Sequence, residues 1–229
     1  MVAKSKCHII ITGTGRAGIT FLMQLFTSLG FDTGFTNLTS NLFLNCNAGM
    51  EWDFRKPSSP YVIKSPHLCD YLDDVLETKN IIIEHAIVPV RDLYSASESR
   101  RNVTRTSDEK LYKEKIPGGL WHTDNPDHQE AILTKQLYKL IYTITKWDIP
   151  ITLMHFPRLV QEGGYLYSKI KPILNGISYE KFENIFQKVA QPELIHRFDS
   201  VENANQIKLK TQTSFQKLDG KNSQEQLEV

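Results

Sequence analysis

The stretch of sequence that decides the fold reads His8-Ile9-Ile10-Ile11-Thr12-Gly13-Thr14-Gly15-Arg16-Ala17-Gly18-Ile19-Thr20-Phe21-Leu22. Its apolar first part is typical of a buried strand, and its last residues begin a helical pattern. Between them lie three glycines, which permit a tight turn from a strand into a helix. Such a turn directs backbone N–H groups and the positive end of a helix towards an anion. The stretch therefore predicts a phosphate-binding loop.

The spacing of Gly13, Gly18 and Thr20 fits the loop of ATP-binding proteins, G-x-x-x-x-G-K-[ST], at every position but one. Ile19 stands where that loop has a lysine, which contacts the terminal phosphates. An ordinary ATPase is therefore disfavoured, and a P-loop kinase acting on a small metabolite is kept as an alternative. A second alternative is that the glycines only permit a tight turn between strand and helix, and that the loop binds no phosphate.

Two further apolar stretches, each predicted to be a strand, end at a basic residue. One leads into Lys64, and the other, residues 81–90, leads into Arg91. Asp92 is suited to cap a helix that follows, and this helix carries Ser99 eight residues after Arg91. The carboxyl ends of successive strands thus bring positive charge to the same region as the loop.

In this order the motifs resemble those of PAPS-dependent sulfotransferases of the bacterial type, over roughly residues 7–174. The loop is similar to the family's phosphosulfate loop, Gly-x-x-Arg/Lys-Ser-Gly-Thr-Thr-x-Leu. The segment 64–67 is similar to the family's Lys-Ser-Pro-His segment. Val90-Arg91-Asp92, with Ser99-Arg100 downstream, is similar to the signature Val-Arg-Asp…Ser-Arg.

The resemblance implies a donor, a product and a set of residues. The donor would be 3′-phosphoadenosine 5′-phosphosulfate (PAPS), the product adenosine 3′,5′-bisphosphate (PAP), and no metal would be needed. Arg91 and Ser99 would hold the 3′-phosphate, and Arg16 and Lys64 would offset the charge that develops during transfer. The 5′-phosphate would be held by the loop residues Gly15, Arg16, Ala17, Gly18, Ile19 and Thr20.

The sequence departs from the family pattern at three positions. Ala17 and Ile19 replace hydroxyl-bearing residues of the loop, and Pro66 stands where the cytosolic enzymes have a catalytic histidine. These departures leave open a third function, that of a nucleotide-binding protein without catalysis.

Transfer to a hydroxyl also requires a group that takes its proton. We expect this base to be His67, which lies three residues after Lys64, or Glu51, from the segment before the second predicted strand. His122 and Asp53 rank behind these two.

Four apolar stretches are predicted to be strands of the main sheet, at 7–12, 60–65, 81–90 and 150–156. Helical patterns separate them, which predicts an α/β fold with three layers, like that of P-loop NTPases, with a central and mostly parallel sheet. We expect one sulfotransferase-like domain, residues 1–198, and a polar extension over 199–229. Because Pro89 lacks an N–H group, its strand should be irregular or lie at a sheet edge near its end.

The polar loop 106–125 is longer than an ordinary connection between elements, which is typical of functional loops. We expect a lid, with Gly118 and Gly119 as its hinge and Trp121 closing over the acceptor.

The composition of the 229 residues excludes several partners. With 27 basic and 26 acidic residues, the chain has no bias towards nucleic acid. The first apolar run is too short for a signal sequence or a membrane span, so we expect a cytoplasmic protein with no membrane partner. The partner left is a small-molecule acceptor, and nothing in the sequence indicates an oligomeric state.

Overall fold

The computed structural model describes residues 6–39, 41–43, 48–78, 81–107, 116–195 and 198. Apart from Phe198, these residues belong to one compact unit, Met1–His196. The predicted extension 199–229 lies outside the described residues.

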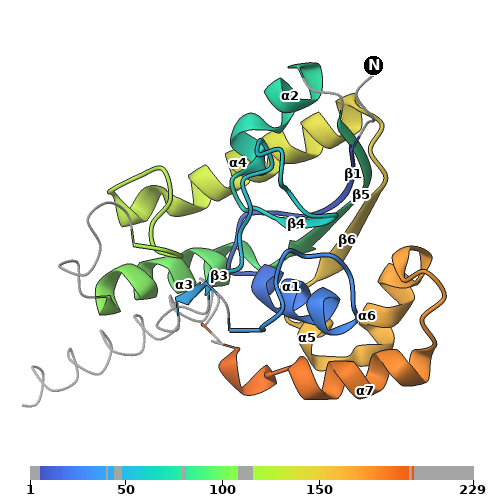
Figure 1. Ribbon diagram of the computed structural model, residues 1–229. Coiled ribbons are helices and arrows are strands. Elements are labelled where there is room, and N and C mark those ends of the chain that lie inside the picture. The colour runs from blue at the N-terminus through green and yellow to red at the C-terminus, as the bar shows by residue number, and fades with distance from the viewer. Residues whose placement is uncertain are drawn as a thin grey trace, which may run out of the picture. The chain divides into compact units, whose positions relative to one another are not determined.

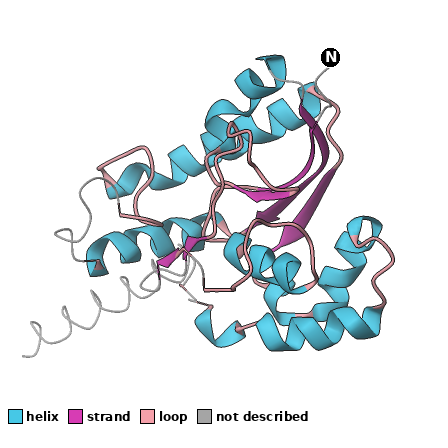
Figure 2. Cartoon of the chain, viewed as in Figure 1, coloured by secondary structure: helices cyan, strands magenta, loops and turns pink. Residues whose placement is uncertain are grey.

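In the described part of the chain, a parallel sheet of four strands forms the centre of this unit (Figure 2). The strand order is β4-β1-β5-β6, so β1 and β5 are the interior strands. The strands span Lys6–Ile11 (β1), Val62–Lys64 (β4), Ile81–Val90 (β5) and Ile151–His155 (β6). A separate antiparallel pair is formed by β2, Leu42–Phe43, and β3, Ala48–Gly49.

Helices cover both faces of the sheet, which gives three layers (Figure 1). One face carries α1 (Ile19–Ser28), α5 (Arg158–Gln161), α6 (Gly163–Ile170) and α7 (Tyr179–Val189). The other carries α2 (Leu68–Thr78), α3 (Leu93–Thr106) and α4 (Gln129–Lys146). Short 3-10 helices lie at Pro126–His128, Lys171–Ile173 and Pro192–Leu194. None of the described helices has the length and apolar character needed to cross a membrane.

The apolar run of β1 explains why both faces are covered. Ile9 and Ile11 point into a core formed with α1, α6 and α7, whereas Ile10 packs with Ile63 of β4 and with α2 and α4. Adjacent residues of a strand point to opposite faces, so a run without polar residues requires helices on both sides.

The order of the strands also locates a binding region. The chain passes from β1 to β4 on one side and then to β5 on the other side of β1. In an open α/β sheet such a reversal leaves a crevice at the carboxyl ends of the strands, where ligands bind. The loop that contains Arg16, the end of β4 at Lys64 and the end of β5 before Arg91 all lie at this edge.

The expectation for Pro89 is confirmed in part: its strand is not an edge strand, but its pairing with β1 is irregular and ends before Pro89. β5 is an interior strand, and it continues through Pro89, which pairs with Met154 of β6. The last residue of β1, Ile11, pairs with Ile87, so β1 has ended before Pro89 and no strand hydrogen bond is lost there. The pairing with β1 shifts register elsewhere, at Glu84.

Candidate functional site

A cavity of about 560 Å³ lies at the carboxyl edge of the sheet. Cavities of this size are typical of sites for small molecules and cofactors. Its wall is built from the loop after β1, the ends of β4 and β5, α3, and the segments 48–51 and 116–121. It contains most of the site residues predicted from the sequence, namely Gly15, Arg16, Gly18, Ile19, Thr20, Glu51, Lys64, His67, Arg91 and Ser99.

The loop after β1 has the backbone of an anion-binding turn. Gly15, Arg16 and Gly18 have positive φ angles of 71°, 56° and 83°. At Gly15 a side chain is also excluded by space, because a Cβ atom would lie 2.6 Å from Nη2 of Arg100. Gly18 caps α1 without offering a side-chain acceptor to the N–H groups of the first helical turn. These groups, at the positive end of the helix, can therefore donate to an anion in the cavity.

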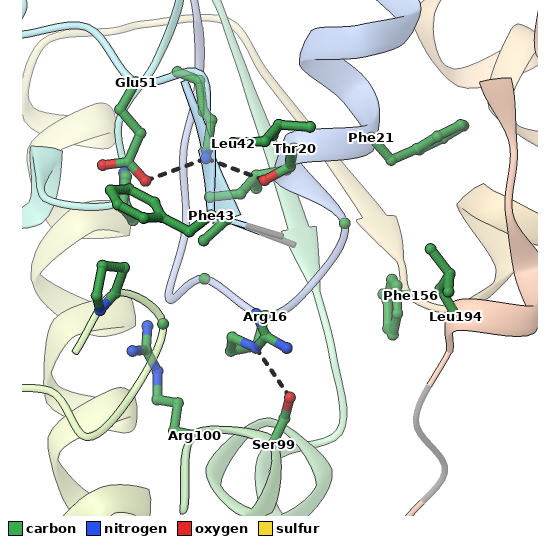
Figure 3. Close-up of a pocket in the computed structure, with 18 of the residues that line it drawn as sticks. Arg16, Thr20, Phe21, Leu42, Phe43, Glu51, Ser99, Arg100, Phe156 and Leu194 are labelled. Atoms are coloured by element: carbon green, nitrogen blue, oxygen red, sulfur yellow. Dashed lines mark hydrogen bonds and ion pairs between the residues drawn. The ribbon is translucent and has the colours of Figure 1, made fainter. Parts of the chain in front are cut away.

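Two arginines and a serine meet beside this loop. Nη1 of Arg91 donates to the backbone oxygen of Arg16 (2.9 Å), and Nε of Arg16 donates to Oγ of Ser99 (3.0 Å; Figure 3). Burial of the guanidinium, together with repulsion by Arg16, lowers the pKa of Arg91 to about 10. Two partly desolvated guanidinium groups next to a hydroxyl form a strong site for a phosphate or sulfate group.

Lys64 lies deeper in the same cavity and is only 1% exposed. Its Nζ donates to Oγ1 of Thr20 (3.1 Å), to Oε1 of Glu51 (3.2 Å) and to the backbone oxygen of Gly49. These acceptors offset the cost of burying the ammonium group. β4 thus places the ammonium group of Lys64 beside the hydroxyl of Thr20. Thr20 follows Ile19, which stands where the loop of ATP-binding proteins has its lysine.

The two favoured candidates for the base also line the cavity. Glu51 is paired with Lys64, and its side chain is 38% exposed. The ring of His67 packs edge-on against Trp121, with 5.6 Å between the ring centroids. Desolvation in the cavity wall lowers the pKa of His67, although the charge of Glu51 opposes this effect. The neutral imidazole, which can accept a proton, is therefore favoured near pH 7.

Three of the predicted residues are not part of the wall. The carboxylate of Asp53 pairs with Arg55, and Nε2 of His122 lies 3.1 Å from Oδ2 of Asp70. The methyl group of Ala17 is buried in the core, so only the backbone of this residue can contact a ligand.

Trp121 forms a fixed part of the wall. It is 5% exposed and belongs to the core, and its backbone N–H donates to Oε1 of Gln129 (2.7 Å). The structure thus anchors the residue that was expected to close over an acceptor. Residues 108–115 of the expected lid lie outside the described residues.

The sequence analysis missed a third arginine of the cavity wall, Arg100. Its side chain donates to the backbone oxygens of Gly119 (2.8 Å) and Thr14, and its Cζ lies 4.9 Å from the ring centroid of Trp121. Burial and the charge of Arg16 lower the pKa of Arg100 to about 9. The sequence signalled it only as the last residue of the Ser99-Arg100 signature, with no role attached, and arginines of a helix are usually exposed.

The cavity extends to both sides of Arg16. Figure 3 shows Phe21, Phe156 and Leu194 on one side of Arg16, and Glu51 and Phe43 on the other. We name the first group the Phe156 end. We name the second the Glu51 end.

Comparison with known proteins supports the fold and leaves the family open. No protein-family model and no curated protein matches this sequence. Among solved structures, a sulfotransferase domain from the curacin biosynthetic pathway matches with a TM-score of 0.50 and 15% sequence identity. The match covers 80% of this chain and 78% of that domain. The chain therefore has a sulfotransferase-like α/β fold, with a central parallel sheet between two layers of helices.

Proposed function

We propose that this protein is a sulfotransferase that moves a sulfonate group from PAPS to a hydroxyl or amine of a small molecule. The observation that carries the proposal is that one cavity holds both the paired arginines Arg16 and Arg91 and the buried lysine Lys64. A donor with two anionic ends and a reactive sulfonate needs cations at two separate places. The sulfotransferase-like fold supports this arrangement.

The donor would lie along the loop. Its 3′-phosphate matches Arg91 and Ser99, and its 5′-phosphosulfate matches Arg16, Thr20 and the N–H groups at the start of α1. The purine ring matches the Phe156 end, because the apolar side chains Phe21, Phe156 and Leu194 line the cavity there. Lys64 then faces the sulfonate from the side of the Glu51 end.

During transfer, the bond between sulfur and the bridging phosphate oxygen breaks while the acceptor oxygen bonds to sulfur. The electron pair of the broken bond stays on the phosphate of PAP, and the acceptor proton goes to a base. Arg16 and Lys64 would stabilise the negative charge on the sulfonyl and bridging oxygens. Two groups of the wall can take the proton: the carboxylate of Glu51, and the neutral imidazole of His67.

A P-loop kinase has weaker support from the same cavity. Ile19 removes the loop lysine, and the buried lysine comes from β4 instead. A nucleotide-binding protein without catalysis would use the same donor residues, so only an activity measurement separates it from the enzyme.

The first test is the binding of PAP, measured by titration calorimetry against ATP with Mg²⁺. We expect PAP to bind and ATP to bind more weakly. Arg91→Ala should weaken the binding of PAP by about 1.5–3 kcal/mol, because a phosphate group loses a charge-assisted hydrogen bond. Arg158→Ala is the matched control, since Arg158 is exposed and pairs with Glu162.

Two results would count against the proposal. Tight binding of ATP without binding of PAP would favour the kinase. Binding of PAP without transfer of labelled sulfonate from PAPS to any acceptor in a broad panel would favour the non-catalytic protein.

A further inference from the structure

We infer that Arg100 is a positioning residue for the donor, because it holds the phosphate loop in the conformation that binds an anion. The phosphate loop is the turn of residues 12–18 between β1 and α1. The inference rests on the proposed function only for the identity of the anion, PAPS or PAP. It goes further by assigning a role to a side chain that acts on the loop and not on the donor itself.

The first argument is the backbone conformation of the loop, which its own residues do not favour. Arg16 has a φ of 56°, which is rare for a residue with a side chain. Gly15 and Gly18, with φ angles of 71° and 83°, lie on either side of it in the sequence. Residues in such conformations persist only where their surroundings hold them in place. The loop therefore depends on contacts from other segments.

Two guanidinium groups supply contacts of this kind. Arg100 donates to the backbone oxygen of Thr14, and Nη1 of Arg91 donates to the backbone oxygen of Arg16 (2.9 Å). Both peptide bonds that follow these carbonyls are trans, and in a trans peptide the N–H points away from the C=O. The two arginines therefore also fix the directions of the next two N–H groups of the loop. Such N–H groups are what a loop of this kind offers to an anion.

The contact between Arg100 and the loop is close, and the guanidinium is itself held from a second segment (Figure 3). A Cβ atom at Gly15 would lie 2.6 Å from Nη2 of Arg100, so the loop leaves no space between them. The guanidinium also donates to the backbone oxygen of Gly119 (2.8 Å), and its Cζ lies 4.9 Å from the ring centroid of Trp121. Because the segment 119–121 fixes the guanidinium, Arg100 is a rigid support for the loop.

The surroundings of Arg100 are poorly suited to a role in stability alone. The side chain is 6% exposed, and both hydrogen bonds go to uncharged backbone oxygens. Among the described residues, its Nε has no hydrogen-bond partner. A buried cation with such partners recovers little of the cost of leaving water. Its place in the cavity wall is better explained by the conformation that it gives the loop.

The test begins with the affinity of Arg100→Lys for PAP, measured by titration calorimetry. Lysine keeps the charge but lacks the planar fork that reaches the backbone oxygens of both Thr14 and Gly119. When a loop populates its binding conformation only about a tenth of the time, the affinity falls roughly tenfold, which is the effect we expect. Without PAP, amide hydrogen exchange of residues 13–18 should be faster in this variant than in the unaltered protein.

Thr104→Val is the matched control. Thr104 lies on the same helix, α3, and its Oγ1 accepts a hydrogen bond from the N–H of Leu120 (2.9 Å). The substitution thus removes a hydrogen bond to the same wall segment and leaves the bond between Arg100 and Thr14 in place. We expect lower stability in both variants. In Thr104→Val, however, the affinity for PAP should change less than roughly twofold, and the exchange of residues 13–18 should stay the same.

The outcomes separate the inference from the proposed function. Unchanged affinity for PAP in Arg100→Lys, unchanged exchange of the loop amides, or equal effects in the control would each overturn the inference. Weaker binding of PAP with unchanged loop exchange would mean that Arg100 contacts the donor directly. Failure of PAP to bind to the unaltered protein would overturn the proposed function, and loop exchange in the free variants would still test the role of Arg100.

A measurement on the unaltered protein keeps the inference testable even where Arg100→Lys does not fold. Hydrogen bonds to two fixed carbonyls restrict the rotation of a guanidinium group. Nitrogen NMR should therefore show separate signals for the two Nη atoms of Arg100. One averaged signal would overturn the inference.

Discussion

A single buried guanidinium joins two of the segments that form the wall of the cavity. Arg100, on α3, is 6% exposed, and it donates to Thr14 of the phosphate loop and to Gly119 of the segment 116–121. Its flat group also lies over Trp121. Only a guanidinium, which is planar and has several N–H donors, can donate to both carbonyls and stack on a ring in this way.

Arg100→Lys should therefore be harmful although it retains the charge. One ammonium group cannot replace both hydrogen bonds, and a buried carbonyl left without a partner costs about 1–3 kcal/mol of unfolding free energy. Urea denaturation measures this loss. Arg105→Lys, at a side chain that is 64% exposed on the same helix, should change stability by less than about 0.5 kcal/mol. Equal effects of the two changes would contradict the role of Arg100.

Residues that lie next to strand ends could be placed from the sequence, whereas contacts between distant segments could not. Lys64 and Arg91 end apolar strands, so their place at the sheet edge follows from the pattern alone. The partner of Lys64, Glu51, lies outside any regular element. It reaches the lysine only because the segment 48–52 folds back on β4, where the N–H of Trp52 donates to the backbone oxygen of Lys64 (3.1 Å).

Among the elements, α3 carries two side chains of the cavity wall, Ser99 and Arg100, and its start is fixed by a local signal. Oδ1 of Asp92 accepts a hydrogen bond from the N–H of Ser95 (2.8 Å), which caps the helix. The helix then presents Ser99 and Arg100 to the cavity from its second turn. The cap therefore sets the positions of both side chains.

Asp92→Ala should lower the unfolding free energy by about 0.5–2 kcal/mol, because the helix loses its cap. It should also weaken the binding of PAP, because Ser99 and Arg100 line the cavity from the same helix. Ser178→Ala removes the equivalent cap of α7 and serves as the control. It should cost a similar amount of stability and leave the calorimetric affinity for PAP unchanged. A loss of affinity in both variants would show that general destabilisation is the cause.

The elements themselves were largely predictable, because alternation of apolar strands with capped helices is a local pattern. The position of a strand within the sheet is not local. Because Pro89 lacks an N–H group, the sequence favours an edge position or an irregularity for its strand. The missing N–H costs no hydrogen bond to β1, because β1 ends at Ile11, before it reaches Pro89. The order and length of strands depend on how they pair in the folded protein, and the local pattern of one sequence predicts neither.

At the scale of the whole molecule, partly desolvated histidines make stability depend on pH. Desolvation lowers the pKa of His8 and His85, and also that of His67 in the cavity wall. Between the lowered pKa of the folded state and the ordinary value of about 6.5, the unfolded chain binds more protons than the folded one. The unfolding free energy therefore falls as the pH falls below that value.

Urea midpoints at pH 7.5 and pH 5.5 check this prediction, and the midpoint should be lower at pH 5.5. His8 is buried beside Phe54, with 5.2 Å between the ring centroids, so His8→Phe keeps an aromatic ring there and removes one titrating group, at the cost of the hydrogen bond between Nδ1 and the backbone oxygen of Pro60 (2.7 Å). The variant should show a smaller difference between the two midpoints. An unchanged difference would mean that His8 does not contribute.

The ammonium group of Lys64 has a consequence for any ligand that approaches it. Such a group has three N–H bonds, and its acceptors among the described residues include Thr20, Gly49 and Glu51. A new oxygen that binds this nitrogen therefore competes with acceptors already in place, and the side chain of Glu51 is 38% exposed. The affinity of the lysine for a ligand is then the difference between two hydrogen bonds, and an exchange with Glu51 releases a carboxylate into the cavity.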